Sequence, residues 1–314
     1  MEKKVAITIL TMNKKHLIDD CLSTLRKNTS YKNYRTIVVD NASTDGTAEL
    51  IKKKFKWVDL IVNNENLGFA RGQNVGIKFA VEKYDPDYVF LLNDDTQMIQ
   101  KDWLTKMVEA AESDYDVGIV GCRLIYSDGK LQFFAKNHEV HLIQKNDPRE
   151  YSDEGIIQDV NSTIGATFLI KKRLIDKIGL IDPGYYPIYG DEIDYCERAK
   201  KNGFKIRYTP YATIVHLGAQ TIDPKKSLKV WELQKRASIR LELINYSIPQ
   251  IIYWQAMHLI SVFFKREAGS SRSLIFKKDF IFRIPLLIRA YFYNFSRIGE
   301  ILYRRAHVHE KIWY

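Results

Sequence analysis

Two adjacent carboxylates, Asp94 and Asp95, follow the apolar run Tyr88–Leu92 and a single Asn93. The run is rich in aromatic and branched residues and predicts a β-strand. Ligands of open α/β sheets bind beyond the carboxyl ends of the strands, where these acids would lie. Carboxylate oxygens suit Mg²⁺ or Mn²⁺, so they could hold a divalent cation together with a diphosphate. The alternative is structural, because Asp95 and Thr96 could cap the helix that follows.

Polar residues and glycines also follow the other predicted strands of the N-terminal half. Parallel strands end at the same edge of a sheet, so these residues would line one crevice. There a carboxylate can accept hydrogen bonds from a nucleobase or ribose, a glycine lets backbone approach a ligand, and an arginine offers positive charge to a phosphate. Each could instead be a helix cap, a tight turn or a surface charge. The residues concerned are Thr11, Asn13, Asp40, Asn66, Gly68, Arg71, Gly72 and Asn74.

Length and composition are those of a globular protein with two unlike parts. The chain has 314 residues, enough for a sizeable core, and 46% of them are hydrophobic. Its three cysteines lie far apart, which favours a reducing compartment over a disulfide framework or a zinc site. Residues 225–314 hold 17 Lys and Arg against 6 Asp and Glu, whereas residues 1–224 have a net charge of −1. The first apolar run, Val5–Leu10, is too short for a signal peptide, and no run is long enough to span a membrane.

Strands and helices alternate in the first part. We expect strands at 5–10, 36–40, 60–63 and 88–92, with helices at 14–27, 47–55 and 69–83. This alternation predicts parallel strands joined by crossover helices, a Rossmann-like half. Further on we expect a hairpin of 117–125 with 131–135, strands at 160–170, 206–208 and 213–216, and a loop at 137–158. A helix is expected at 191–201, held by an i, i+4 ion pair between Asp194 and Arg198.

Beyond Pro224 the chain is predicted to be helical, with breaks at Pro249, around Gly269 and at Pro285. Aromatic and aliphatic residues are interleaved there with Lys and Arg, a composition typical of segments that bind a membrane interface. A helical subdomain packed on the rest of the chain, or a dimer contact, would use the same residues. Residues 225–314 are therefore predicted to serve membrane association or oligomerisation. A non-catalytic scaffold that binds nucleotide or nucleic acid is a further alternative that the charge allows.

Five sequence blocks together resemble the nucleotide-sugar glycosyltransferases of family 2, especially their rhamnosyltransferase-like branch. The blocks begin at Asp40, Asn66, Leu91, Gly165 and Tyr189 and read DNASTDGT, NLGF, LLNDDT, GATFLI and YGDEIDYCER. The resemblance covers about residues 5–218 and implies the α/β GT-A fold, with a Rossmann-like nucleotide-binding half, an acceptor half and a central mixed sheet. It implies a catalytic domain at 1–224, divided into a donor half at 1–100 and an acceptor half at 101–224.

The resemblance also implies roles for individual residues. Asn93 and Asp95 match the family's DXD element, which makes Asp95 an expected metal ligand and Asp94 a contact for the donor ribose or for water on the metal. His216 matches a position where many relatives have a metal-ligating histidine. Asp191 and Glu192 match the acidic pair whose second member is usually the general base. The expected donor-binding residues are Thr11, Asn13, Asp40, Asn66, Gly68, Arg71, Asn74, Asn93 and Asp94.

The activity implied is inverting transfer of a sugar from dTDP-rhamnose or a UDP-sugar to a hydroxyl of a lipid-linked glycan, with Mg²⁺ or Mn²⁺ as cofactor. In such a transfer a base takes the hydroxyl proton on one face of the sugar, and a cation stabilises the diphosphate leaving group on the other. The expected location is peripheral, on the cytoplasmic face of the membrane, where clustered Lys and Arg meet anionic lipid. No nucleic-acid partner is expected, and a homodimer is a further option.

Overall fold

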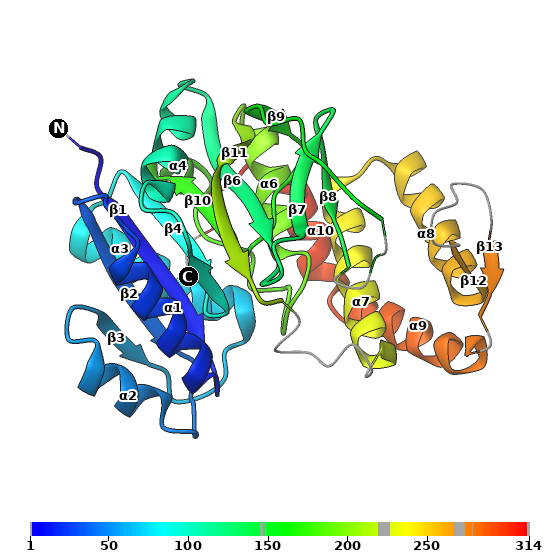
Figure 1. Ribbon diagram of the computed structural model, residues 1–314. Coiled ribbons are helices and arrows are strands. Elements are labelled where there is room, and N and C mark those ends of the chain that lie inside the picture. The colour runs from blue at the N-terminus through cyan, green and yellow to red at the C-terminus, as the bar shows by residue number, and fades with distance from the viewer. Residues whose placement is uncertain are drawn as a thin grey trace.

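The structure, a computed structural model, describes residues 2–144, 147, 149–218, 227–266, 274–277 and 279–312. One mixed sheet forms its centre, with strands in the order β3-β2-β1-β4-β10-β6-β11-β5 and with β7, β8 and β9 beside them (Figure 1). The strands are β1 Val5–Thr11, β2 Tyr34–Asp40, β3 Asp59–Val62, β4 Tyr88–Asn93, β5 Thr96–Met98, β6 Val117–Ile125, β7 Leu131–Lys136, β8 Glu139–Leu142, β9 Gln158–Val160, β10 Thr167–Lys171 and β11 Lys205–His216.

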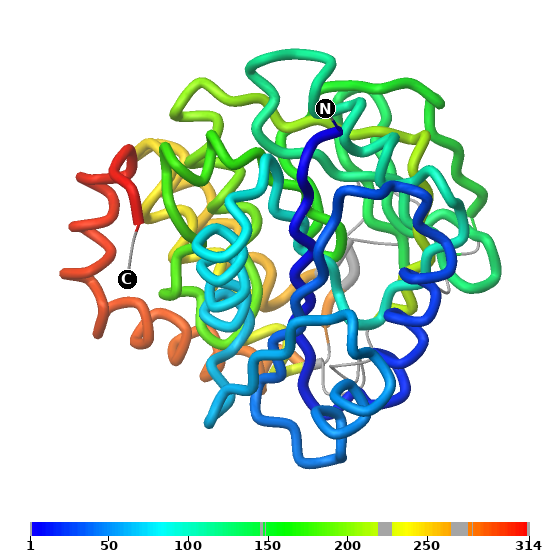
Figure 2. The backbone as a smooth tube through the Cα atoms, turned by 90° about the vertical axis from the view of Figure 1, so that its left-hand side faces the viewer, coloured from blue at the N-terminus to red at the C-terminus, as the bar shows by residue number. Residues whose placement is uncertain are grey.

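The N-terminal half is the parallel, crossover-connected unit that the alternating pattern predicts. Strands β1 to β4 are parallel, and helices α1 (Lys15–Lys27), α2 (Thr47–Lys54) and α3 (Gly68–Tyr84) join them. Figure 2 shows α1 and α3 on opposite sides of β1. Because both faces of the sheet are covered, β1 and β4 are apolar along almost their whole length. Apart from Thr8 in the middle of β1, their polar residues come at the carboxyl ends, where Thr11 pairs with Asp40.

The second half turns the sheet from parallel to mixed. Strand β10 is antiparallel to both β4 and β6, and β11 then runs parallel to β6. Helices α4 (Trp103–Glu112), α5 (Lys172–Ile178) and α6 (Asp191–Lys201) belong to this half. The short strand β5 pairs with the end of β11 and places His216 opposite Thr96. The segment after β4, which carries Asp94 and Asp95, is thereby brought beside the carboxyl end of β11.

Four local predictions are wrong. The stretch 160–170 forms two strands, β9 and β10, because β9 pairs with β11 whereas β10 pairs with β4 and β6. The segments 206–208 and 213–216 belong to one strand, β11, with a register shift between them. The loop expected at 137–158 contains β8, which pairs with β7. Asp95 and Thr96 do not cap a helix, since Thr96 begins β5 and its hydroxyl donates to the Asn93 carbonyl at 2.7 Å.

The C-terminal region consists of α7 (Ser227–Asn245), α8 (Ile248–Phe263), α9 (Phe280–Phe295) and α10 (Ile298–Ala306), with a hairpin of β12 (Phe264–Arg266) and β13 (Leu274–Phe276). Pro249 lies in the first turn of α8, where the missing N–H has no helical partner to lose. The predicted break at Pro285 is wrong: α9 continues through this proline, which falls early in the helix. The break around Gly269 lies outside the described residues. No helix in the described ranges is long and apolar enough to cross a bilayer.

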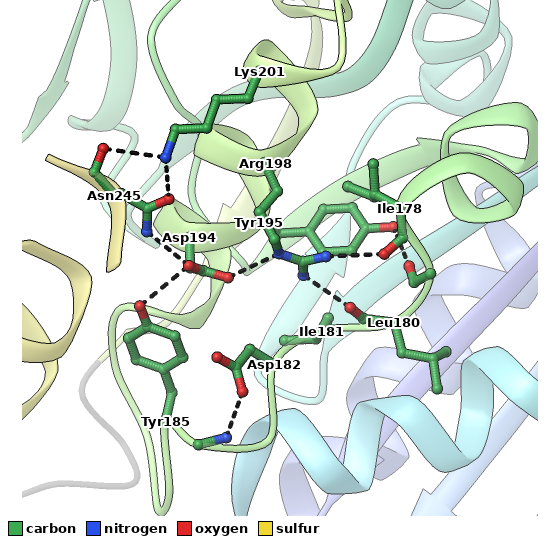
Figure 3. Close-up of polar contacts among 12 residues, drawn as sticks. Ile178, Leu180, Ile181, Asp182, Tyr185, Asp194, Tyr195, Arg198, Lys201 and Asn245 are labelled. Carbon is green, nitrogen blue, oxygen red and sulfur yellow. Dashed lines mark hydrogen bonds and ion pairs between the residues drawn. The ribbon is translucent and has the colours of Figure 1, made fainter. Parts of the chain in front are cut away.

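A buried ion pair fixes α6 in place. The Arg198 side chain is fully buried, and its Nε donates to Asp194 Oδ2 at 3.0 Å, which confirms the predicted i, i+4 pair. Its other two nitrogens donate to the carbonyls of Ile178 and Leu180 at 3.1 and 2.8 Å (Figure 3). All three nitrogens of a buried guanidinium are thus satisfied, as burial of a charge requires. Helix α6 is locked to the segment that follows α5.

The C-terminal helix α7 joins the same network. The Asn245 amide donates to Asp194 Oδ1 at 2.8 Å, and Arg240 Nη2 donates to buried Asp182 at 2.8 Å. Asp182 in turn accepts a hydrogen bond from the backbone N–H of Gly184. The segment 182–190, which leads into α6, is therefore fastened to α7 at Asp182, and α6 itself is fastened to α7 at Asp194.

Replacing Arg198 by methionine should destabilise the protein strongly. The change leaves Asp194 buried with its main ionic partner removed, a situation that costs about 3–5 kcal/mol. The matched control is Lys200→Met on the same helix, whose ion pair with Glu197 is partly exposed and worth less than about 1 kcal/mol. Urea unfolding followed by circular dichroism measures both variants. Equal losses of unfolding free energy would contradict the importance assigned to the buried pair.

Candidate active site at the carboxyl ends of the strands

Asp95 and His216 face each other beyond the ends of β4 and β11. His216 Nε2 lies 3.2 Å from Asp95 Oδ1, and both side chains are about nine-tenths buried. Asp95 Oδ1 receives no hydrogen bond. On the other side of the imidazole, Nδ1 lies 2.8 Å from the amide oxygen of Gln132. An oxygen acceptor at Nδ1 favours the tautomer protonated there, which leaves the Nε2 lone pair directed toward Asp95.

This pair fits a divalent cation. A buried carboxylate oxygen without a donor suits Mg²⁺ or Mn²⁺, and the imidazole nitrogen adds a ligand of the kind that transition metals accept. Among the described residues, no group of three or more His, Cys, Asp or Glu side chains is placed to hold a metal. Of the described residues, Asp95 and His216 are therefore the candidate pair, and a bound ligand or water could complete the coordination.

Asp94, the residue before Asp95, has a hydrogen-bond partner of its own. The hydroxyl of Thr11 donates to Asp94 Oδ2 at 2.7 Å, which links the ends of β1 and β4. Burial, and after it the neighbouring charge of Asp95, raises the pKa of Asp94 to about 7. Two carboxylates placed this close repel each other, so the site favours any ligand that brings positive charge.

A second buried carboxylate lies at the carboxyl end of β2, beside the end of β1. Asp40 is fully buried; one of its oxygens accepts the backbone N–H of Ser43 at 3.0 Å, and the other has no hydrogen-bond partner. Asn13 adopts a left-handed conformation with φ 52°, and its side-chain oxygen accepts the backbone N–H of Thr44 at 2.7 Å. These contacts tie the segments after β1 and β2 together and leave an oxygen of Asp40 to be satisfied.

Asn41 organises the loop after β3, and its role escaped the residue-by-residue prediction. Its amide nitrogen donates to Asn66 Oδ1 at 2.9 Å, and its oxygen accepts the backbone N–H of Leu67 at 3.1 Å. Asn66 Oδ1 also accepts the backbone N–H of Gly68. The buried amide of Asn41 thus holds Asn66 in place. The sequence signal for this role of Asn41 is its position directly after Asp40 in the same sequence block.

Two predicted glycines lie close to side chains of this chain. A Cβ on Gly68, where φ is +75°, would lie 2.8 Å from the Tyr186 ring, and one on Gly72 would lie 2.6 Å from Leu10. Close packing therefore needs a glycine at both positions, and contact of their backbone with a ligand stays a prediction.

Asn74 has a structural role, and the donor contacts of Asn74 and Arg71 stay predictions. The Asn74 amide donates to the Ile181 carbonyl at 2.8 Å and accepts the Ile181 N–H at 3.0 Å. Both ends of this amide are used in fastening α3 to the segment after α5. Arg71 is exposed on α3 and lines a cavity of about 310 Å³ together with Leu180 and Pro183.

The acidic pair Asp191 and Glu192 opens α6. Asp191 is 1% exposed, and its Oδ2 has no hydrogen-bond partner. Burial first, and then the charge of Glu192, raises the pKa of Asp191 well above its ordinary range. Burial also raises the pKa of Glu192, which by surface exposure is only half-buried. Gly190, with φ +79°, turns the chain into the helix and so places the pair in its first turn.

The bend 165–166 connects this pair with the residues after β4. The backbone N–H of Asn93 donates to the carbonyl of Ala166 at 3.0 Å. A Cβ on the neighbouring Gly165 would lie 3.8 Å from Cβ of Glu192 and 3.7 Å from the Phe69 ring. The acidic pair of α6 thus lies at the same edge of the sheet as the segment Asn93 to Asp95.

The family profile described as "Glycosyl transferase family 2" matches residues 6–179, more than half of the chain. Among curated proteins, the hexosyltransferase Agl10 of low-salt glycan biosynthesis from Haloferax volcanii is 21% identical over 72% of this chain and 73% of its own length. The poly-beta-1,6-N-acetyl-D-glucosamine synthase of Staphylococcus aureus is 27% identical over 69% of this chain and 51% of its length. An uncharacterized protein, y4gI of Sinorhizobium fredii, is 26% identical over 68% of this chain. The chain spans about a quarter of that protein's length and half of the synthase.

Two solved structures share the fold. The mannosyltransferase PcManGT from Pyrobaculum calidifontis, in complex with GDP-Man and Mn²⁺, aligns with a TM-score of 0.58 at 15% identity, over 95% of this chain and 76% of that one. GalNAc-T7 with UDP, GalNAc and Mn²⁺ aligns with a TM-score of 0.62 at 14% identity, over 96% of this chain and 57% of that one. The GT-A fold expected from the sequence is confirmed, and the chain belongs to glycosyltransferase family 2.

Proposed function

We propose that this protein transfers a sugar from a nucleoside-diphosphate sugar to a hydroxyl acceptor, with inversion at the anomeric carbon. The observation that carries the proposal is the placement of two different acidic sites at one edge of the sheet. Asp95 with His216 offers ligands for a cation, and Asp191 with Glu192 offers a proton acceptor. Inverting transfer needs these two functions on opposite faces of the sugar.

Glu192 is the proposed general base. Its raised pKa favours uptake of the acceptor's hydroxyl proton near neutral pH, and its partial exposure leaves the carboxylate accessible. As the proton moves to Glu192, the hydroxyl oxygen bonds to the anomeric carbon. The bond from that carbon to the diphosphate breaks on the opposite face, and the nucleoside diphosphate leaves with the electron pair. A divalent cation held by Asp95 and His216 would stabilise the negative charge that grows on this leaving group.

The proposed donor is dTDP-rhamnose or a UDP-sugar. The unpaired, buried oxygen of Asp40 is an acceptor suited to the ring N–H that thymine and uracil share. The sequence blocks that resemble the rhamnosyltransferase-like branch support the first donor. Solved relatives that hold Mn²⁺ with GDP-Man or UDP support a nucleotide and a divalent metal in this fold.

The proposed acceptor is a lipid-linked glycan in the synthesis of a cell-surface polysaccharide, reached from the cytoplasmic face of the membrane. The excess of Lys and Arg in residues 225–314 supports attraction to anionic lipid. Exposed aromatic and aliphatic side chains on α8 and α9, among them Trp254 and Phe292, support insertion between headgroups.

Nucleotide binding should stabilise the protein in a metal-dependent way. UDP or dTDP with Mn²⁺, at about 100 times Kd, should add about 2.7 kcal/mol, which for a chain of this size raises Tm by about 4 °C. Asp95→Ala should abolish the Mn²⁺-dependent part, whereas Asp102→Ala, at an exposed acid outside the site, should not. Thermal shift against UDP, dTDP, GDP and CDP, with and without Mn²⁺, is the measurement. No shift with any nucleotide at millimolar concentration would refute the donor site.

Glu192→Gln should lower the turnover rate by about 100-fold or more, because it removes the proton acceptor and keeps the shape of the side chain. Glu197→Gln on the same helix is the matched control and should leave turnover near that of the wild type. Release of nucleoside diphosphate in the presence of a glycan acceptor reports the rate. Equal rates for Glu192→Gln and the wild type would exclude Glu192 as the base.

Asp191→Asn should make the protein more stable at pH 8. The raised pKa of Asp191 means that the folded state disfavours the charged carboxylate. The destabilisation caused by this charge therefore grows as pH rises from the ordinary carboxyl range toward the folded-state pKa. The gain in Tm over the wild type should therefore be larger at pH 8 than at pH 5. A gain of the same size at both pH values would show that charge burial is not its origin.

A further inference from the structure

The imidazole of His216 has a neighbour on each side, and only one of the two contacts is a hydrogen bond. Nδ1 lies 2.8 Å from the side-chain oxygen of Gln132, within hydrogen-bond distance. Nε2 lies 3.2 Å from Asp95 Oδ1, yet that oxygen receives no hydrogen bond. The missing bond indicates that the imidazole proton is on Nδ1, the side of Gln132. The state of this ring therefore depends on how Gln132 is held.

Gln132 is enclosed within the hairpin that β6 and β7 form. It is only 3% exposed. Its backbone carbonyl accepts the N–H of Ile143 at 2.8 Å, which fastens β7 to the segment after β8. A Cβ on Gly218 would lie 2.7 Å from Gln132 Nε2, so the segment after β11 lies directly against the amide. The side chain is therefore confined on the side of the hairpin and on the side of β11.

The phenol of Tyr126 indicates which end of the Gln132 amide faces the imidazole. Its hydroxyl donates to the carbonyl of Ile143 at 2.7 Å, so the phenol oxygen is left as an acceptor. Burial raises the pKa of Tyr126, and a hydrogen bond from the Gln132 side chain acts against this increase. Only the nitrogen of an amide can donate such a bond, so the amide oxygen is the end that faces His216.

This orientation of the amide has a chemical consequence at the other ring nitrogen. With an oxygen at Nδ1, the neutral imidazole carries its proton there and has a lone pair at Nε2. The lone pair lies beside the buried oxygen of Asp95, and two electron-rich atoms so close together favour a cation between them. With the amide reversed, Nε2 would carry the proton and would have no lone pair to offer a metal.

We propose that Gln132 is a positioning residue of the cation site: its amide oxygen keeps the lone pair of His216 Nε2 available to a divalent cation, and Tyr126 keeps the amide in that orientation. The inference rests on the proposed function for the presence of the cation. It makes cation binding depend on the hairpin of β6 and β7, which itself supplies no ligand. If Gln132 only filled space beside His216, neither the tautomer nor the cation affinity would depend on its amide.

Nitrogen NMR of the metal-free protein with isotope-labelled histidine measures the tautomer directly. At pH 8, well above the ordinary imidazole pKa of about 6.5, His216 should carry its proton on Nδ1. Its signal is the one missing from the spectrum of His216→Gln. Gln132→Met keeps the size of the side chain and removes the acceptor, so the proton should move to Nε2. Gln132→Glu retains an acceptor oxygen and should keep the proton on Nδ1, whereas Tyr126→Phe should give a mixture of both tautomers.

Electron paramagnetic resonance of free Mn²⁺, with and without UDP, measures the affinity of the same variants for the cation. Gln132→Met should bind Mn²⁺ about 10- to 100-fold more weakly than the wild type, and Gln132→Glu should restore the affinity. Gln158→Met on β9 is the matched control, because Gln158 is 5% exposed and its amide oxygen accepts the backbone N–H of His138 at 2.7 Å. This control also removes a buried amide, so it should lower the stability and leave the Mn²⁺ affinity unchanged.

Three results would overturn the role of Gln132: a wild-type His216 with its proton on Nε2, an unchanged tautomer in Gln132→Met, or equal Mn²⁺ affinities of Gln132→Met and Gln158→Met. The wild-type tautomer in Tyr126→Phe would overturn the role of Tyr126. The thermal shift with UDP or dTDP and Mn²⁺, repeated on the same samples, separates the two proposals. A Mn²⁺-dependent nucleotide response that Gln132→Met leaves intact would refute the inference alone. Weaker Mn²⁺ binding by Gln132→Met, with no nucleotide response in the wild type, would support the inference and refute the proposed function.

Discussion

The position of the acidic pair depends on one buried cation. Arg198 has no exposed surface, so its charge is tolerated only because Asp194 and two carbonyl groups take up its three nitrogens. These partners come from α6 itself and from the segment that follows α5, and they set where α6 begins. Because Asp191 and Glu192 occupy the first turn of α6, the same contacts decide how far the pair projects toward the bend 165–166.

The functional carboxylates are placed against the ordinary rules of stability. Asp40, Asp95 and Asp191 each have a buried oxygen without a hydrogen bond, a condition that folded proteins usually avoid. All three lie at the carboxyl ends of the strands or in the first turn of α6. Under the proposed function, a bound ligand would supply the partners that these oxygens lack.

Regular elements and the local ion pair could be predicted from the sequence, whereas contacts between distant segments could not. Strands β1, β2 and β4 and helix α6 follow from periodicity, and the pair of Asp194 with Arg198 follows from helical spacing. The contacts of Gly68 and Asn74 could not be predicted, because their partners, Tyr186 and Ile181, come from a segment far along the chain. A glycine needed for close approach has the same sequence signal whether a ligand or a side chain fills the space.

The contact of α7 with the segment before α6 has a consequence for how this chain can change in evolution. A Cβ on Gly190 would lie 3.2 Å from the Ala237 side chain, and Arg240 of the same helix holds Asp182. The C-terminal helices therefore cannot be exchanged between relatives as a module, although their composition differs sharply from that of the rest. An exchange would have to carry a small residue at 237 and an arginine at 240, or change 182 and 190 at the same time. Substitutions should accordingly be tolerated more freely on the outer faces of α8 and α9, while the inner face of α7 changes together with the segment 182–190.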